Sequence, residues 1–511
     1  MTIPQINERS AGILLHITSL PSPFGMGDLG EEAYKFARFL AKSNQKWWQI
    51  LPLNPTDHGE FPSPYSSNSS MAGNTMLISP ELLADEGLLE ILDLPKYYLP
   101  VTSKANFNEA RKIKYELFEK AYQNFLEEDH FVREQEYEQF CKQEHYWLHD
   151  YAIYVSLKHE YNGYSWHHWP EEFKLRNKKS LEKFLAQHKK DIDKTKWLQW
   201  IFFRQWKNLR SYCNKINVHF FGDLPFYVSH DSVDVWSNSE IFSLDKNGES
   251  IFIAGCPPDY FSEDGQRWGM PVFRWDVLKK QNYDWWIKRL AKNMELYDLL
   301  RLDHFMAFSR YWNIDAKEET ARNGTWVQGP GEDFFNKMKV AFGSLPFVAE
   351  DLGDCDENVY KIRDSFGLPG MKILQFGFGS SEADAIHKPH NYGYNFIVYA
   401  GNHDNNTTRG WYSKEAGKHD HKRLKKYTGI RITEKNVAEV LGKMVYASVC
   451  KIAILTMQDI LNLDETFRMN TPGTMENNWT WRLENDQLSK SIERKLKGWT
   501  KLYDRISFLK K

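Results

Sequence analysis

The sequence predicts an α/β fold, a (β/α)8 barrel that carries helical and loop insertions. Three observations support this prediction: eight short apolar runs, helical stretches between most of them, and acidic residues that follow four of the runs. Alternating strands and helices are typical of a parallel sheet, and eight such units suggest that the sheet closes on itself. With 511 residues, the chain is long enough for one barrel with insertions.

The eight candidate strands are nearly continuous apolar runs, as expected for parallel strands that are buried on both faces. They cover residues 12–19, 47–53, 218–227, 298–305, 347–351, 371–378, 397–403 and 451–460. Helical patterns separate most of them, for example at 31–42 after the first run and at 285–296 before the fourth. We therefore expect a single barrel domain over residues 1–511.

A long insertion separates the second run from the third. The gap is far too long for a loop, and much of it has helical periodicity. Its two clearest apolar stripes are Ile113, Leu117, Ala121 and Phe125, and Leu198, Phe202, Trp206, Leu209 and Cys213. We predict an insertion at 60–210 that contains a mainly helical subdomain at about 80–200.

Composition and charge exclude several classes of protein. The formal net charge is −2, so no excess of positive charge suggests a nucleic-acid partner. The first residues lack a signal-peptide pattern, and no apolar run is long enough to span a membrane. The five cysteines are scattered and odd in number, which indicates free thiols in a reducing compartment and hence a cytoplasmic protein. Without a phosphate-binding glycine loop or a clear cluster of metal ligands, we expect no cofactor and no metal.

Aromatic residues make up 15% of the chain, including 19 Trp and 26 Tyr. A large hydrophobic core would use this many rings. Aromatic rings also stack on the C–H faces of sugar rings, so a carbohydrate site would use them as well. Composition alone favours neither explanation.

Four of the runs have an acidic residue at or just beyond their C-terminal end: Asp223, Asp303, Glu350 and Asp404. In barrel enzymes the chemistry takes place at this end of the strands, where such side chains meet in one mouth. A helix N-cap or a loop turn explains any one acidic residue equally well, but it explains all four together less readily. The pattern therefore favours a catalytic site.

The neighbours of these acids suggest different chemical roles. Arg301 and Asp303 are two residues apart on one strand, so their side chains point the same way. A guanidinium favours the ionised carboxylate that a nucleophile needs, although a structural ion pair is the alternative. A partly desolvated Glu350 near other carboxylates would have a raised pKa and could act as a general acid. His403 and Asp404 could hydrogen-bond sugar hydroxyls or, alternatively, bind a metal.

Segments along almost the whole chain resemble one enzyme family. They include GILLHITSLPSPFGMGDLG, SPYSS, GDLPFYVSHDSVDVW, PPDYFSEDGQRWG, RLDHF, VAEDLG, HDNNTTRGW and RMNTPGT. In this order they resemble the amylomaltases, or 4-α-glucanotransferases, a branch of the α-amylase clan. The resemblance implies a catalytic barrel that moves segments of α-1,4-glucan, with maltooligosaccharides and glucans as its partners.

The resemblance also implies roles for single residues. Asp303, in RLDHF, would be the nucleophile. Glu350, in VAEDLG, would be the general acid/base, and Asp404, in HDN, would stabilise the transition state. The expected reaction is a double displacement with retention at the anomeric carbon.

Further residues would bind the sugar. Arg301 and His403 would contact it at the point of cleavage, and Asp223 and Tyr65 would be additional subsite residues. Tyr65, in SPYSS, would stack on the sugar whose bond is cut.

The segment PPDYFSEDGQRWG resembles the loop that covers the cleft in this family, and we predict a lid-like loop insertion at 228–275. Tyr260, Phe261 and Trp268 could clasp a glucan chain, or they could simply pack the loop against the barrel. Two alternatives for the whole protein stay open: a mainly hydrolytic α-glucanase on the same barrel, and a catalytically inactive glucan-binding protein.

Overall fold

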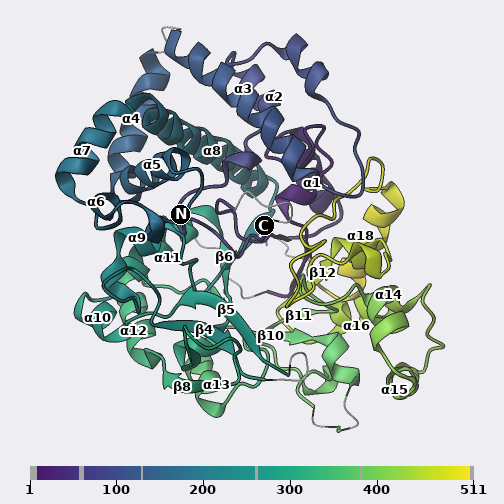
Figure 1. Cartoon of the computed structure of the whole chain (residues 1–511). Helices are drawn as coiled ribbons and strands as arrows, with labels where there is room; N and C mark the ends of the chain where they lie inside the picture. The colour runs from purple at the N-terminus through teal and green to yellow at the C-terminus, as the bar shows by residue number, and fades with distance from the viewer. Residues whose placement is uncertain are drawn as a thin grey trace.

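Two sheets and a layer of helices make up the molecule (Figure 1). The structure is a computed structural model, and it describes residues 8–56, 62–127, 131–258, 263–379, 382–383 and 385–506. The larger sheet has eight strands and the smaller one has four. Within the described residues, no helix combines the length and apolar character that a membrane crossing requires.

The eight-stranded sheet is a nearly closed parallel barrel. Its strands are β1 (Ser10–Leu14), β2 (Trp47–Gln49), β3 (His219–Leu224), β6 (Leu299–Leu302), β9 (Phe347–Ala349), β10 (Gly370–Ile373), β11 (Phe396–Tyr399) and β12 (Ile452–Thr456). They follow the order β10-β11-β12-β1-β2-β3-β6-β9, and all neighbours are parallel. A hydrogen bond of 2.8 Å from the Ala349 amide to the Pro369 carbonyl joins the two outer strands.

The predicted barrel is confirmed, since each of the eight apolar runs supplies one strand. The strands are shorter than the runs, because several runs continue into the turns at the mouth of the barrel. One buried cluster takes side chains from all eight strands and fills the inside of the barrel: Leu14, Trp47, Phe221, Leu299, Val348, Met371, Ile373, Ile397, Tyr399, Ile452 and Ile454. Alternate residues such as Ile13, Trp48 and Phe220 pack outward, which explains the near-continuous apolar pattern.

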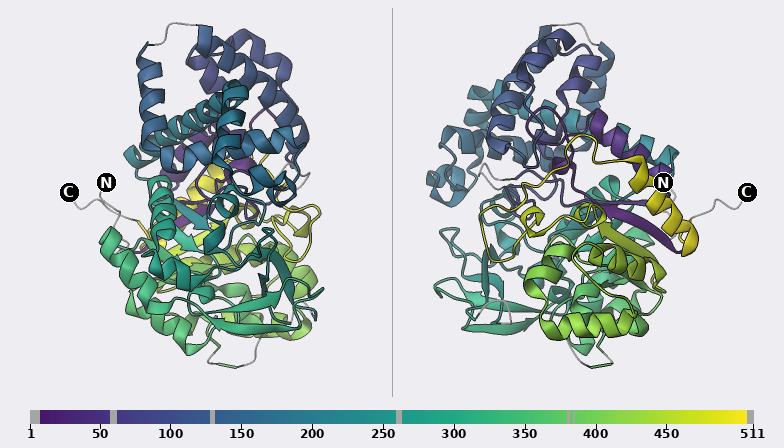
Figure 2. Two further views of the ribbon diagram at one scale, coloured as in Figure 1. Left: turned by 60° about the vertical axis from the view of Figure 1, so that its left-hand side comes forward. Right: turned by 90° about the vertical axis from the view of Figure 1, so that its right-hand side faces the viewer.

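Helices cover the outside of the barrel. Helix α1 (Glu31–Lys42) buries Ala33, Phe36, Ala37 and Leu40 at the spacing of one helical face. The others around the barrel are α11 (Asp284–Leu296), α12 (Gly331–Phe342), α13 (Glu357–Ser365), α15 (Lys418–Thr428), α16 (Val437–Ala447) and α18 (Lys490–Leu502). Helix α18 packs beside α1 and α16, so the two ends of the described chain meet (Figure 2).

The fully buried Arg505 links the segments where the two ends of the described chain meet. Its guanidinium donates to the carbonyls of Ser10 at 3.0 Å, Cys450 at 3.1 Å and Ser448 at 2.8 Å. These carbonyls lie at the start of β1 and just before β12. One side chain therefore ties the first and the last barrel strands together.

The chain between β2 and β3 is mainly helical and forms a layer beside the barrel (Figures 1 and 2). Its helices are α2 (Pro80–Asp85), α3 (Phe107–Glu127), α4 (Phe131–Gln143), α5 (His145–Glu160), α6 (Glu171–Lys174), α7 (Lys178–Gln187) and α8 (Lys189–Lys215), with a short 3-10 turn, η4 (Trp166–His168). Phe125 packs against Trp197 and Trp200 at ring distances of 5.7 Å. Part of the aromatic content therefore serves the core.

The four-stranded antiparallel sheet was not foreseen from the sequence. It has the order β5-β4-β7-β8, with β4 (Phe252–Cys256), β5 (Gln266–Pro271), β7 (Arg310–Asp315) and β8 (Gly324–Gln328). The segment predicted as a lid-like loop insertion, 228–275, contains β4, β5 and α9 (Val233–Ser237), and it ends at the first residue of α10 (Trp275–Lys280). Strands β7 and β8 come from beyond that segment and follow β6, so the sheet borders the mouth of the barrel.

Candidate active site

Four carboxylates lie at one end of the barrel. Asp223 is in β3, Asp303 follows β6, Glu350 follows β9, and Asp404 lies five residues beyond β11. All four therefore occupy the C-terminal ends of parallel strands, where the chemistry of barrel enzymes is located. Hydrogen bonds and ion pairs, described below, link Asp223, Asp303 and Asp404, and Glu350 accepts from the backbone amide of His304, the residue after Asp303.

Arg301 lies at the centre of one side of this site, between Asp223 and Asp303. Its Nη1 atom lies 2.9 Å from each carboxylate oxygen of Asp223 and 2.7 Å from Oδ1 of Asp303. Burial opposes the charge of Arg301, but the two carboxylates outweigh it and raise its pKa well above the ordinary value. The predicted same-side placement of Arg301 and Asp303 is present as a direct ion pair.

The two carboxylates on Arg301 differ in access. The side chain of Asp303 is 27% exposed, whereas that of Asp223 is fully buried. Asp223 accepts a second hydrogen bond, of 2.8 Å, from the Tyr65 hydroxyl. Burial raises the pKa of Asp223, and Arg301 opposes this rise. Asp303 is thus the member of the pair that is open to a substrate.

Glu350 lies in an environment that favours its protonated form. Burial raises its pKa well above the ordinary value; Asp303 and Asp351 add to the rise, and Arg301 opposes it. The backbone amide of His304 donates to Oε2 of Glu350 at 2.8 Å. His304 has a left-handed backbone with φ of 49°, which is uncommon for a residue other than glycine and aims this amide at Glu350.

Asp404 lies in an environment that favours its ionised form. Its Oδ1 accepts from the Asn470 amide at 2.7 Å, its Oδ2 is 3.3 Å from Nε2 of His403, and Arg468 donates to its backbone carbonyl at 2.6 Å. Desolvation in the cleft acts to raise its pKa, but His403, the Asn470 hydrogen bond, Arg301 and Arg468 together lower it below the ordinary value. Asp404 therefore stays ionised while its side chain is 37% exposed.

Tyr65 joins the two sides of the site. Its hydroxyl donates to Asp223 and lies 2.7 Å from Nε2 of the buried His403. Because the Tyr65 hydroxyl donates its single proton to Asp223, Nε2 of His403 is the donor in the second contact. This fixes a tautomer in which the His403 N–H is also aimed at Asp404. The Tyr65 and His403 rings are nearly parallel, at 12°, and Trp479 lies 5.7 Å from Tyr65.

The lid-like segment contributes one described ring to the site. Trp268, on β5, meets the His304 ring edge-on at 4.9 Å and lies 6.2 Å from Tyr227. It is only partly buried. Tyr260 and Phe261 lie outside the described residues.

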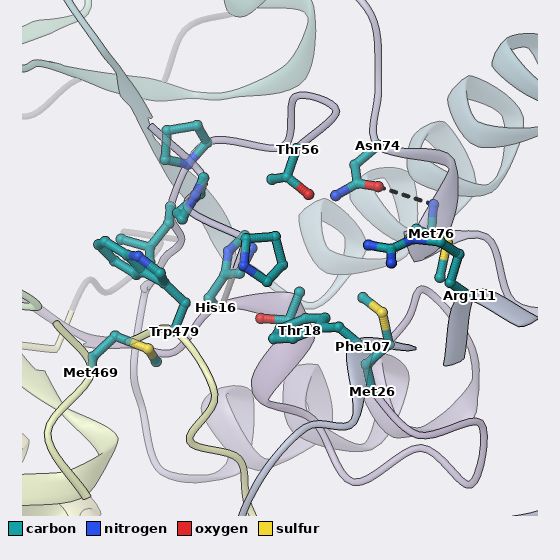
Figure 3. Close-up of a pocket in the computed structure, with 14 residues that line it drawn as sticks. His16, Thr18, Met26, Thr56, Asn74, Met76, Phe107, Arg111, Met469 and Trp479 are labelled. Atoms are coloured by element: carbon teal, nitrogen blue, oxygen red, sulfur yellow. Dashed lines mark hydrogen bonds between the residues drawn. The ribbon is translucent and has the colours of Figure 1, made fainter. Parts of the chain in front are cut away.

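A pocket adjoins the side of the site that carries Asp404 (Figure 3). Asn74 and Arg111 line it on one side, and Met469 and Trp479 line it on the other. Trp479 is the same ring that neighbours Tyr65, so the pocket extends the cleft. Burial, with a smaller effect from His403, lowers the pKa of His16 in its wall to about 3, so this imidazole is neutral.

Several residues of the site were not predicted from the sequence. Arg468, Asn470 and Trp479 hold or flank Asp404 and its neighbours, and His304 contacts Glu350 through its backbone. Two of the resembling segments contain such residues: RMNTPGT contains Arg468 and Asn470, and RLDHF contains His304, but the resemblance gave these three residues no role. The predicted residues Tyr65, Asp223, Trp268, Arg301, Asp303, Glu350, His403 and Asp404 all lie in this one contact network.

Comparisons with known proteins show the family. A family model described as 4-alpha-glucanotransferase matches residues 15–488. The chain is 44% identical to a 4-alpha-glucanotransferase of Aquifex aeolicus over 94% of this chain and 97% of the relative. It is 42% identical to that of Synechocystis over 98% and 99%.

A solved structure extends the likeness to the whole fold. The amylomaltase from Streptococcus agalactiae, in complex with acarbose, superposes with a TM-score of 0.93 at 37% identity and covers 98% of this chain and 100% of its own. The family match begins directly after β1 and includes the other seven barrel strands and every carboxylate of the site. The chain belongs to the 4-α-glucanotransferase family.

Proposed function

We propose that the chain transfers segments of α-1,4-glucan to the 4-hydroxyl group of an acceptor glucan or glucose, by a retaining double displacement. The observation that carries this proposal is that two carboxylates at the mouth of the barrel lie in different environments. Asp303 is partly exposed and paired with Arg301, whereas burial and neighbouring carboxylates raise the pKa of Glu350. Environments that separate the protonation of two such groups are typical of a nucleophile and a general acid.

In the first half of the reaction, Glu350 gives its proton to the glycosidic oxygen while an oxygen of Asp303 attacks the anomeric carbon. The bond between that carbon and the glycosidic oxygen breaks, and its electron pair stays with the departing glucan. A glycosyl–Asp303 ester and an ionised Glu350 result. In the second half, Glu350 takes the proton of the acceptor hydroxyl, whose oxygen displaces Asp303.

Asp404 would stabilise positive charge on the sugar ring in both transition states. A carboxylate can do this only when it is ionised, and the partners of Asp404 favour that form. Its exposed side chain can also accept hydrogen bonds from sugar hydroxyls. His403 and Tyr65 border the same space, which supports their predicted contacts with the sugar at the cleavage point.

Arg301 and Asp223 would act mainly through other groups. Arg301 holds Asp303 at 2.7 Å, and Asp223 in turn holds Arg301 and Tyr65. Because Asp223 is fully buried, its role is best supported as a positioning residue rather than as a contact with substrate. Such placement keeps the nucleophile in line for attack.

Transfer exceeds hydrolysis only if an acceptor sugar reaches the ester before water does. Trp268 beside His304 supplies an aromatic surface next to the two catalytic carboxylates, and Tyr260 and Phe261 are predicted to add to it. A cleft lined by rings favours a sugar and excludes water. This arrangement favours the transferase over a mainly hydrolytic α-glucanase.

Maltotriose tests the proposal directly. We expect the parent protein to convert it into glucose and a ladder of longer maltooligosaccharides, and Asp303→Asn to lose about 10⁴-fold or more of this activity. Asp284→Asn, on the exposed face of α11, is the matched control and should keep full activity. Glucose and maltose alone would indicate the hydrolytic alternative, and no reaction would indicate an inactive glucan-binding protein.

A further inference from the structure

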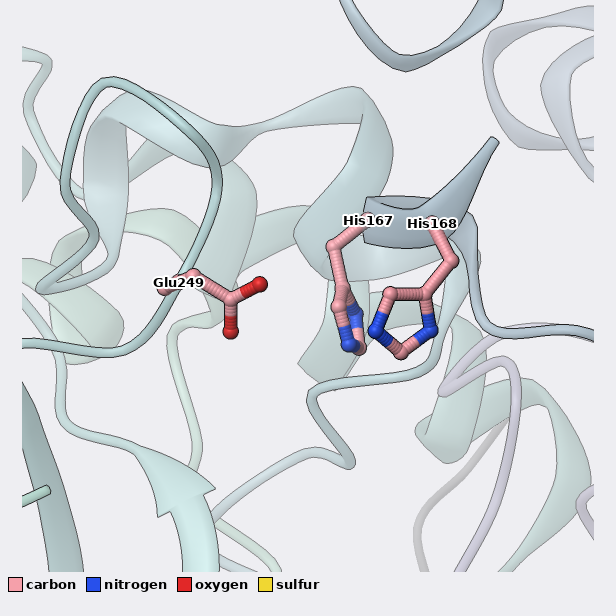
Figure 4. Close-up of side chains that lie close together, drawn as sticks. All are labelled: His167, His168 and Glu249. Carbon is pink, nitrogen blue, oxygen red and sulfur yellow. The ribbon is translucent and has the colours of Figure 1, made fainter. Parts of the chain in front are cut away.

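Two histidines and a glutamate meet where the helical insertion touches the loop before β4 (Figure 4). His167 and His168 belong to η4, and Glu249 lies on the loop. One potential ligand atom from each residue lies within 4.8 Å of the others. Among the residues that the structure describes, this is the one group of three or more His, Cys, Asp or Glu side chains with such proximity.

The two elements that carry these side chains are docked firmly on each other. Gly248 packs so closely on the Trp166 ring that an added Cβ atom would lie 2.6 Å from it. His230 donates from Nε2 to the Gly248 carbonyl at 2.8 Å, and Trp166 donates from Nε1 to the His230 carbonyl at 2.7 Å. The backbone of Glu249 is therefore fixed relative to η4.

The imidazole of His167 is held in place from two sides. It stacks on the His230 ring at 4.6 Å and 23°, and the Trp166 ring meets it edge-on at 5.9 Å. Its Nδ1 atom is buried and has no hydrogen-bond partner in the described part of the chain. A nitrogen of a fixed ring is thus available to a ligand.

We propose that His167, His168 and Glu249 bind a divalent transition-metal ion, best matched by Zn²⁺. Two imidazole nitrogens and one carboxylate oxygen are ligands that zinc prefers, with a water molecule in a fourth position. Zinc–ligand bonds of about 2.0–2.2 Å place tetrahedral ligand atoms about 3.3–3.6 Å apart. His168 and Glu249 are exposed, so small side-chain rotations close the remaining gap.

The ion has a structural consequence. It joins the helical insertion to the loop that leads into β4, and so to the antiparallel sheet that carries Trp268. A ligand that binds only the folded state stabilises that state. None of the three side chains belongs to the proposed catalytic machinery, so transfer activity does not require the metal.

Zinc titration of the untagged full chain, stripped with a chelator, tests the site. We expect about one Zn²⁺ per chain with a roughly micromolar dissociation constant, weaker than that of four-ligand structural sites. His168→Ala and Glu249→Gln should each weaken binding by about tenfold or more. The melting temperature of the parent should rise by roughly 2–3 °C at a hundredfold excess over the dissociation constant.

A second histidine pair provides the control. His145 and His149 lie one turn apart on α5, with ring centroids 5.1 Å apart, and could bind zinc by themselves. His145→Ala should leave the affinity unchanged, and zinc-soaked crystals should show an anomalous peak between His167, His168 and Glu249. The proposal is overturned if zinc does not bind at 100-fold the expected dissociation constant, if either site variant binds as the parent does, or if only His145→Ala loses binding.

Discussion

The nucleophile side and the stabiliser side of the site are built in different ways. On the nucleophile side, Arg301 lies within β6 and Asp303 is the first residue after this strand, so the barrel itself fixes both side chains. On the stabiliser side, Asp404 lies in a loop and is held by Arg468 and Asn470 from a segment more than sixty residues away. Side chains on strands are placed more rigidly than those on loops. Substitutions on the nucleophile side should therefore lower both stability and activity. Substitutions on the stabiliser side should lower activity and leave stability almost unchanged.

After Asp303, the largest effect should come from Glu350, which serves both halves of the reaction. Glu350→Gln should lower kcat on maltotriose by about 10²–10⁴-fold, because it removes the general acid/base. Formation of the glycosyl–enzyme from α-maltosyl fluoride should fall far less, since fluoride departs without a proton. Because burial raises the pKa of Glu350, the alkaline limb of kcat/KM in the parent should report its deprotonation.

Glu357→Gln is the matched control for that variant, because Glu357 is exposed in the first turn of α13. Equal losses on maltotriose and on the fluoride would show that Glu350 is not the general acid. Burst kinetics and a pH series from acid to alkaline conditions provide both measurements.

Arg301→Met tests the coupling on the nucleophile side. It should lower the free energy of unfolding by about 3–5 kcal/mol, because Asp223 is left as an unpaired buried charge. It should also remove most activity. Adding Asp223→Asn should restore part of the stability but not the activity. Urea denaturation and maltotriose assays measure the two effects, with the exposed Arg267→Met as control. A stable but inactive Arg301→Met would contradict the coupling.

Asn470→Ala tests the stabiliser side, where a smaller and purely functional effect is expected. Hydrogen bonds to charged groups contribute about 1.5–3 kcal/mol, so kcat/KM should fall about tenfold to a hundredfold. The Asn470 bond lowers the pKa of Asp404, so its loss should raise that pKa and move the acid limb of kcat/KM to higher pH. The melting temperature should stay close to that of the parent. Asn323→Ala, at an exposed position, is the control, and an unmoved acid limb would reject the role of Asn470.

The smallest effect should come from Trp268, which borders the chemistry without touching the described carboxylates. Trp268→Ala should lower the ratio of transfer to hydrolysis by roughly threefold, because water gains access to the ester. The ratio of chain redistribution to newly formed reducing ends measures this. Trp326→Ala, on the exposed face of β8, should leave the ratio unchanged. If both variants behave alike, Trp268 has no special part in excluding water.

The nucleophile side was predictable from the sequence, because its signals are local. Long apolar runs gave the barrel strands, and the two-residue spacing of Arg301 and Asp303 gave their shared direction. The short strands of the antiparallel sheet mix polar residues with half-exposed rings such as Trp312, so their pattern was too weak to detect.

The stabiliser side depends on contacts between distant parts of the chain, which periodicity cannot show. Asn470 contacts Asp404 across 66 residues of sequence. The proposed metal site has the same character, because Glu249 and His167 are more than eighty residues apart. The left-handed backbone of His304 could not be predicted from the sequence either, because residues other than glycine adopt this conformation only rarely.

The pairing of β1 with β12, which Arg505 holds together, also sets an order of events during synthesis. β1 leaves the ribosome first among the barrel strands and β12 leaves last, yet the two are neighbours in the sheet. At about 5–20 residues per second, roughly 20–90 s separate the emergence of these strands. During that interval one edge of β1 has no native partner. The barrel therefore closes only near the end of translation, and the nascent chain exposes its aggregation-prone edge for most of its synthesis.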